Sequence, residues 1–179
     1  MPWEEAKRWK QGKTNADFYK DAVERGKTLE ARQAARPKVV KPADMPWEDT
    51  PNGRIKWLAN EDMNERLETI DAYMQELAPG GRSGKHCHSA EECLYIIEGK
   101  GYDLHWDVDA DIGDVYTWRM SESPAKWEWE EGDCVYIPPR TVHQHFNPDP
   151  KKPCRFIAAQ NRVYRKIGYD DLTQIEDAP

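Results

Sequence analysis

The sequence of 179 residues has no long apolar run, and its mean hydropathy is −0.98. A membrane-spanning helix needs about 20 consecutive, mainly apolar residues, so the sequence predicts none. Residues 1–12 lack the apolar core of a secretory signal peptide. No internal repeat, low-complexity tract or helix-turn-helix pattern is present. These absences lead us to expect a soluble, cytoplasmic protein.

Positive charge is also scarce. The chain carries 26 Lys and Arg against 33 Asp and Glu, which gives a formal net charge of −7. Proteins that bind nucleic acids or anionic membranes without specificity need clustered positive charge, and no basic cluster occurs here. The partner that we expect is therefore a small molecule rather than a nucleic acid or a membrane.

The cysteines lack the C-x-x-C spacing of zinc ribbons and redox motifs. In the cytoplasm such residues are reduced thiols, and we expect them to be small, buried, hydrophobic side chains. A redox role for Cys93 or Cys134 is the alternative. The four residues are Cys87, Cys93, Cys134 and Cys154.

Two spaced motifs dominate the middle of the chain. The first reads Gly80, five residues, His86-Cys87-His88, three residues, Glu92, six residues and Gly99. Side chains of a strand alternate between its two faces, so His86 and His88 share a face. Glu92 can join them after the turn of residues 89–91. Imidazole and carboxylate groups are ligands of divalent transition metals.

The second motif reads Gly132, five residues, Pro138, His143, three residues and Asn147. Together the motifs resemble those of the cupin family, G-x5-H-x-H-x3-4-E-x6-G and G-x5-P-x-G-x2-H-x3-N. Every position agrees except Arg140, which stands where the family has a glycine. The resemblance covers roughly residues 66–165. It implies a mainly β fold, an antiparallel double-stranded β-helix (a jelly-roll-like barrel), with a metal held by His86, His88, Glu92 and His143.

Three imidazoles and a carboxylate leave one or two coordination positions open on a divalent metal. We take Fe(II) as the first choice, with Mn(II), Ni(II) or Zn(II) as alternatives. Open positions allow a substrate to chelate through two oxygens. The main hypothesis is a dioxygenase that acts on a small aromatic or enediol substrate. The segment His143-Gln144-His145 is similar to the second motif of gentisate-type cupins, whereas Glu92 brings the site closer to the cupins with three histidines and a glutamate.

Two further hypotheses stay open. One is a non-redox lyase or isomerase, with Glu92, His145 or a tyrosine (Tyr95 or Tyr136) as base. The other is a cupin that binds a small molecule without catalysis. Because His145 has the parity of His143, it is a candidate catalytic residue, a fifth ligand or a residue that only fills space.

The other candidate catalytic residue is Arg140, which either clamps a substrate carboxylate or is a solvated turn residue. Arg155 and Gln160 are further candidates for the pocket. The acidic run at 107–114 lacks the Gly and Glu of a calcium loop, so we expect a solvated hairpin there.

Three segments are expected along the chain. Residues 1–52 form a helical arm, capped at Asn15, and a stiff Pro-rich linker. Residues 53–165 form the barrel. Residues 166–179 form a tail, either frayed or with a short helix. The arm has a thin apolar face, so it packs on the barrel, packs on a second copy or is loosely ordered. Together with the linker it fits an arm that crosses to a partner, and we expect a homodimer.

The sequence contains eight tryptophans. We expect most of them in the core and the four that lie between the motifs near the barrel mouth. These four are Trp106, Trp118, Trp127 and Trp129.

Overall fold

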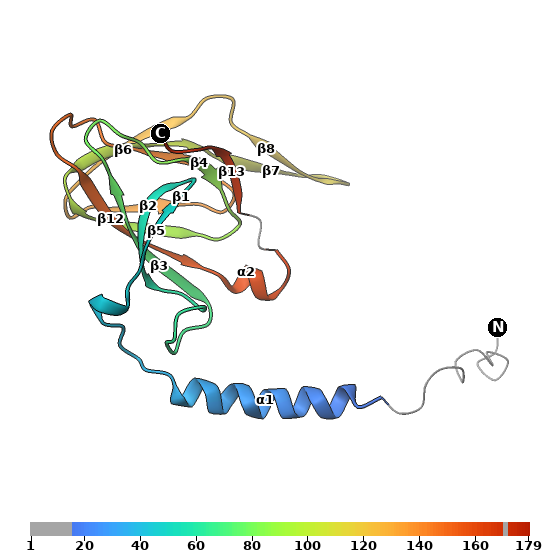
Figure 1. Ribbon diagram of the computed structural model, residues 1–179. Helices are drawn as coiled ribbons and strands as arrows, with labels where there is room; N and C mark the ends of the chain where they lie inside the picture. The colour runs from blue at the N-terminus through green and yellow to red at the C-terminus, as the bar shows by residue number, and fades with distance from the viewer. Residues whose placement is uncertain (1–15, 170–171) are drawn as a thin grey trace. The chain divides into compact units, whose positions relative to one another are not determined.

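The computed structural model describes residues 16–169 and 172–179, which fall into two units, residues up to Arg36 and residues 37–179 (Figure 1). The first unit contains the helix α1 (Phe18–Ala35), which buries none of its side chains. Its N-cap is Asp17; the expected cap, Asn15, lies outside the described residues. The helix ends at Arg36, whose extended backbone is what a following proline favours.

The second unit consists of two antiparallel sheets and a separate hairpin (Figure 1). The first sheet has the order β1 (Trp47–Thr50), β2 (Gly53–Ala59), β3 (Ile70–Leu77), β12 (Cys154–Asn161), β5 (Glu92–Glu98) and β10 (Cys134–Ile137). The second has the order β13 (Thr173–Glu176), β4 (Lys85–Cys87), β11 (Val142–Phe146), β6 (Lys100–Trp106) and β9 (Ala125–Glu130). The hairpin is β7 (Val108–Ile112) and β8 (Tyr116–Met120), and two short helices are η3 (Pro42–Asp44) and α2 (Val163–Lys166).

This architecture confirms the expected mainly antiparallel β fold with an N-terminal helix. Two local expectations differ from it. The segment expected to be a linker contains η3 and β1, and β1 pairs with β2 along its whole length. The tail, expected to be frayed or helical, forms β13, which pairs with β4 and satisfies backbone groups that this strand would otherwise expose.

The core lies between the two sheets and follows the alternation of the strands. On β5, Leu94 and Ile96 are fully buried, whereas Cys93 and Tyr95 face outward. Ile137 and Phe156 complete this core from β10 and β12. Burying each such side chain contributes about 1.5–3 kcal/mol. The same alternation turns Glu92, two residues before Leu94, into the interior.

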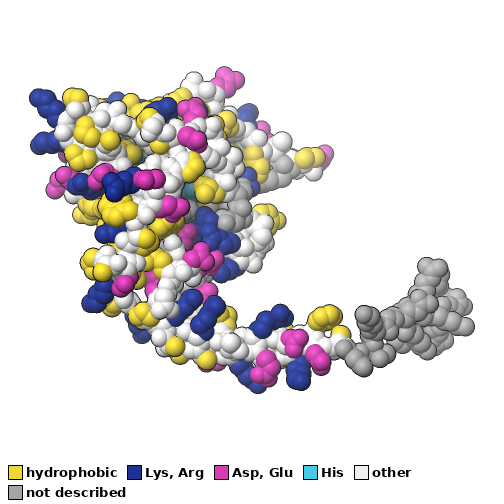
Figure 2. All heavy atoms as spheres, viewed as in Figure 1, with side chains coloured by type: hydrophobic (Ala, Val, Ile, Leu, Met, Phe, Trp, Pro, Cys, Tyr) yellow, Lys and Arg dark blue, Asp and Glu magenta, His cyan; other side chains and the backbone are white. Residues whose placement is uncertain are grey.

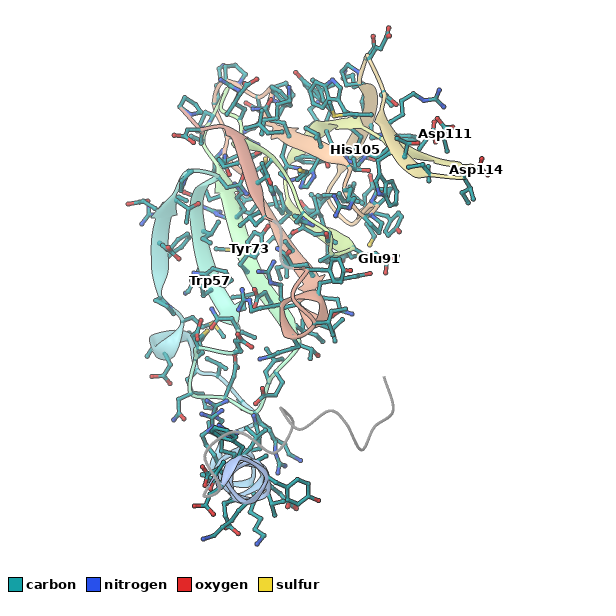
Figure 3. All side chains as sticks on the ribbon, turned by 90° about the vertical axis from the view of Figure 1, so that its right-hand side faces the viewer. Trp57, Tyr73, Glu91, His105, Asp111 and Asp114 are labelled. Carbon is teal, nitrogen blue, oxygen red and sulfur yellow. The ribbon has the colours of Figure 1, made fainter. Side chains whose placement is uncertain are left out.

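Most tryptophans are not in the core, contrary to expectation. Among the described tryptophans only Trp129 is buried, whereas Trp47, Trp118 and Trp127 are 42–54% exposed. Trp118 belongs to the β7–β8 hairpin, which projects from the barrel as a solvated insertion (Figure 1). Asp111 and Asp114 lie in its outer part (Figure 3). In the described part of the chain, no helix has the length and apolar character needed to cross a membrane.

Candidate metal centre

Four side chains from three strand regions converge inside the barrel. His86 on β4 pairs directly with His143 on β11, with ring centroids 4.3 Å apart. His88 follows β4, and Glu92 begins β5 after the short turn between them. The potential ligand atoms of the four residues all lie within 4.8 Å of one another. The structure thus brings together the four residues that the cupin resemblance singled out.

The orientation of the imidazoles fits a metal. His88 donates Nδ1–H to the carbonyl of Ala90 (2.8 Å), and His143 donates Nδ1–H to the carbonyl of Thr141 (2.9 Å). Each bond leaves Nε2 as the ring atom with a free lone pair. These Nε2 atoms lie 3.2 Å and 3.5 Å from Oε2 of Glu92. A cation between them would give His143 Nε2, which has no hydrogen-bond partner, its missing interaction.

The pKa shifts of three of the four residues suit metal binding. Burial lowers the pKa of His86 and of His143. For His88, burial would lower the pKa, but the interactions with Glu92 and the hydrogen bond to Ala90 outweigh it and raise the pKa. For Glu92, burial would raise the pKa, but the interactions with His143 and His88 outweigh it and hold the pKa well below its usual value. Neutral imidazoles and an ionised carboxylate are the forms that coordinate metals.

Tyr73 forms a hydrogen bond with the carboxylate of Glu92, a role that the sequence did not predict. Its hydroxyl donates to Oε1 of Glu92 at 2.8 Å, which leaves Oε2 for the histidines. Burial, and then the charge of Glu92, raise the pKa of Tyr73 well above its usual value, so the phenol stays protonated. Figure 3 shows Tyr73 in the middle of its sheet, and its ring meets Trp57 edge to face at 5.7 Å.

A second buried cluster lies beside the first. His145 faces the interior, as its parity predicts, but its Nδ1 lies 2.9 Å from Oδ1 of Asp103 and it is not one of the four converging groups. Asp103 also accepts a hydrogen bond from Trp129 (2.8 Å) and lies 3.5 Å from Nε2 of His105. Burial would raise the pKa of Asp103, but the charge of His145 and these hydrogen bonds hold it far below normal.

Asp103 and His105 were also missed from the sequence. On β6, Asp103 pairs with His145 of β11 and His105 pairs with His143 of β11. Since His143 also pairs with His86 of β4, three histidines lie side by side on three neighbouring strands. The spacing of two between Asp103 and His105 within an expected strand was the signal that could have found them. All five histidines of the chain are at most 3% exposed, and hardly any histidine colour is visible on the face in Figure 2.

A pocket of about 480 Å³ reaches His105 from outside, between the edge strands β9 and β10. Figure 3 shows His105 on the side of the barrel from which the β7–β8 hairpin projects. The ring centroids of His105 and His143 are 6.3 Å apart, so the inner wall of the pocket adjoins the four-residue cluster. The lining combines aromatic and apolar side chains with three acidic ones. The former include Trp127, Trp129, Val135, Tyr136 and Pro138, and the latter are Asp107, Glu128 and Asp133.

Arg140 lies in the turn before β11, where its backbone N–H donates to the carbonyl of His88 at 2.8 Å. Its φ is +62°, a left-handed conformation that favours glycine, and this explains why a glycine stands here in the motif. Its guanidinium lies 5.7 Å from the centre of the Trp118 ring. The turn therefore holds the backbone of His88 through the N–H of Arg140, independently of the Arg140 side chain.

The other candidates are distributed differently from expectation. Arg155 does not reach the pocket, because its guanidinium pairs with Glu76 and Glu98. Gln160 has the inward parity of β12 and pairs in register with Glu92. The tyrosines proposed as bases are both more than half exposed, Tyr95 at 52% and Tyr136 at 55%, and Tyr136 donates to Glu91.

Residues 73–159 match the family model of the cupin domain. This segment is a cupin domain. No curated protein sequence matches it. Among solved structures, an oxalate decarboxylase variant from Bacillus subtilis shares 17% identity with this cupin at a TM-score of 0.53, with 75% of this chain and 30% of that chain covered. Vicilin from Corylus avellana shares 17% identity at a TM-score of 0.57, with 79% of this chain and 36% of that chain covered.

A salicylate 1,2-dioxygenase from Pseudaminobacter salicylatoxidans shares 19% identity at a TM-score of 0.49, with 68% of this chain and 31% of that chain covered. This cupin spans about a third of the length of each of these proteins. At such identities the likeness shows the fold alone.

Proposed function

We propose that this cupin holds one divalent transition metal with His86, His88, Glu92 and His143 and acts as a dioxygenase on a small aromatic or enediol substrate. The observation that carries the proposal is the convergence of four buried ligand atoms within 4.8 Å. Fe(II) is the metal that we propose first, with Mn(II), Ni(II) or Zn(II) as alternatives. Such a metal supplies open positions for two substrate oxygens and, as Fe(II), electrons for reaction with dioxygen.

The pocket between β9 and β10 supports an aromatic or otherwise planar substrate. Trp127 and Tyr136 line its entrance and are about half exposed, whereas Trp129 lies deeper and is buried. Flat aromatic faces stack well on planar ligands. At the inner wall the imidazole of His105 lines the pocket, which suits a polar substituent of the substrate.

We assign supporting roles to the two remaining candidates. His145 holds Asp103 in place and is therefore a positioning residue for His105. Arg140 lies two residues after Pro138, which lines the pocket, and we propose that it clamps a substrate carboxylate. A clamp that binds substrate and transition state equally would raise KM in Arg140→Gly without changing kcat. If neither constant changes, Arg140 is a turn residue only.

Elemental analysis and oxygen consumption test the proposal. Protein purified without added metal should contain close to one equivalent of a transition metal. An oxygen electrode should then record uptake with at least one member of a panel of catechols, gentisate-like acids and 1,3-diketones. Metal-free protein prepared with a chelator is the control. Absence of any bound metal after reconstitution with Fe(II), Mn(II), Ni(II) and Zn(II) would reject the site itself.

A non-redox lyase or isomerase is the second candidate, and one observation favours it. Asp103 lies between two imidazoles, one of which faces the pocket. A carboxylate paired with an imidazole is a common acid–base arrangement. Turnover that continues without oxygen would select this candidate, whereas metal and ligand binding without turnover would identify a binding protein.

We also propose that the chain forms a homodimer. Taken by itself, the helix α1 exposes the large side chains of Phe18, Tyr19 and Leu29. Packing on a second copy would cover them. Light scattering of the full chain, compared with a chain that begins at Pro37, should show a dimer only when the helix is present.

A further inference from the structure

Two cysteines that the metal centre does not use lie side by side on the outer surface. Cys93 is on β5 and Cys134 is on the neighbouring strand β10, and both are exposed. Their sulfur atoms are 2.9 Å apart. A disulfide bond is about 2.05 Å long, so the two atoms need to approach by less than about 1 Å to bond.

The register of the strands explains this proximity. Cys93 pairs with Tyr136 and Cys134 pairs with Tyr95, so the two cysteines are diagonal neighbours on one face of the sheet. Leu94 and Ile137 point to the other face, into the core. The remaining cysteines lie elsewhere, since Cys154 is buried and Cys87 belongs to the second sheet.

We propose that Cys93 and Cys134 form a reversible disulfide, which makes this pair a redox modification site. The oxidant is a small-molecule disulfide of the glutathione type. One protein sulfur attacks it, forms a mixed disulfide and releases one thiol. The second protein sulfur then displaces the other thiol. In total two protein thiols lose two protons and two electrons, and the small disulfide is reduced to two thiols.

The bond would join the wall of the pocket to the strand that carries Glu92. Among the described strands of this sheet, β10 pairs with β5 alone, so its other side is an open edge. Cys134, Val135 and Tyr136 of β10 line the pocket. Cys93 directly follows Glu92 but faces the opposite side of the sheet. Oxidation therefore fixes the edge strand without entering the barrel.

The test is oxidation of the folded, full-length protein with glutathione disulfide, followed by alkylation and peptide mapping under non-reducing conditions. We expect one cross-linked pair of peptides that contains Cys93 and Cys134, while Cys87 and Cys154 stay alkylated. Dithiothreitol should reverse the link. The cysteines are 41 residues apart, so closing the loop should raise Tm by roughly 5–10 °C.

Cys93→Ser and Cys134→Ser are the control variants, and both positions are exposed, so the fold tolerates them. Each should lose the link and the rise in Tm, whereas Cys87→Ser should keep both. Glutathione left attached to Cys93 or Cys134 of the wild type, or disulfide-linked dimers through these residues, would overturn the proposal. Recovery of four free thiols after prolonged oxidation would overturn it as well.

Discussion

The hydroxyl of Tyr73 on β3 reaches Oε1 of Glu92 on β5, although the strand β12 runs between them. Ala158 of β12 pairs in register with Tyr73 on one side and with Leu94 on the other. Because alanine is small, the tyrosine ring can extend over β12 toward the carboxylate. A residue from outside both motifs thus sets the direction of a metal-binding oxygen.

Replacing Tyr73 by Phe should weaken metal binding while the protein stays folded. Hydrogen bonds that orient a ligand typically contribute 10- to 100-fold to metal affinity, so we expect a loss in that range. Competition with a fluorescent chelator gives the affinity. Tyr95→Phe is the matched control, because this phenol is exposed on the outer face of the same strand as Glu92, and it should bind metal like the wild type.

A comparison of His143→Ala with His105→Ala tests the choice of ligands. The two histidines pair directly across β11 and β6, but only His143 belongs to the four-residue cluster. Loss of one ligand of four should leave purified His143→Ala with little metal, whereas His105→Ala should keep it and lose ligand binding in the pocket. Metal content by mass spectrometry decides, and equal content in His143→Ala and wild type would remove His143 from the site.

The resemblance of the two motifs to the cupin pattern predicted the barrel and the four converging residues. Strand alternation places His86 and His88 on one face, and the fixed spacings of the two motifs connect them with Glu92 and His143. Tyr73 carried no such signal, and the spacing of Asp103 and His105 did not reveal which residues they would face. Their roles depend on which strands become neighbours and in what register, and these pairings join residues from 38 positions apart (His105 and His143) to 85 positions apart (Tyr73 and Ala158).

Local sequence patterns also did not predict which side chains at the edges of the sheets are exposed. The register of β5 and β10 places Cys93 and Cys134 on one face, and alternation turns that face away from the core. Alternation does not reveal that nothing in the described part of the chain covers this face, so both thiols, expected to be buried, are exposed. Trp127 is a second example, because it was expected near the barrel mouth but lies on the edge strand β9 and is 54% exposed.

The left-handed turn at Arg140 predicts effects of different size for two substitutions. An L-residue pays about 1–2 kcal/mol for this conformation, and glycine does not, so Arg140→Gly should change the free energy of unfolding by no more than about 1 kcal/mol. Arg140→Val should destabilise by about 2 kcal/mol, because a β-branched residue tolerates positive φ least. Urea unfolding measures both. A larger loss in the glycine variant would mean that the stacking of Arg140 on Trp118 outweighs the backbone strain.

Asp103 should make the free energy of unfolding depend on pH in the acidic range. Its pKa is held far below normal, because the charge of His145 and hydrogen bonds outweigh the effect of burial. A lowered folded-state pKa stabilises the fold above the unfolded value of about 3.9, and this stabilisation is lost as pH falls further. Asp103→Asn should therefore reduce the free energy of unfolding by about 3 kcal/mol at pH 7, and the difference should shrink below about pH 3.9. Urea titrations with chelator present measure it, with Asp111→Asn as the exposed control. If the difference in unfolding free energy between wild type and Asp103→Asn does not change with pH, Asp103 stabilises the fold through its shape and not through its charge.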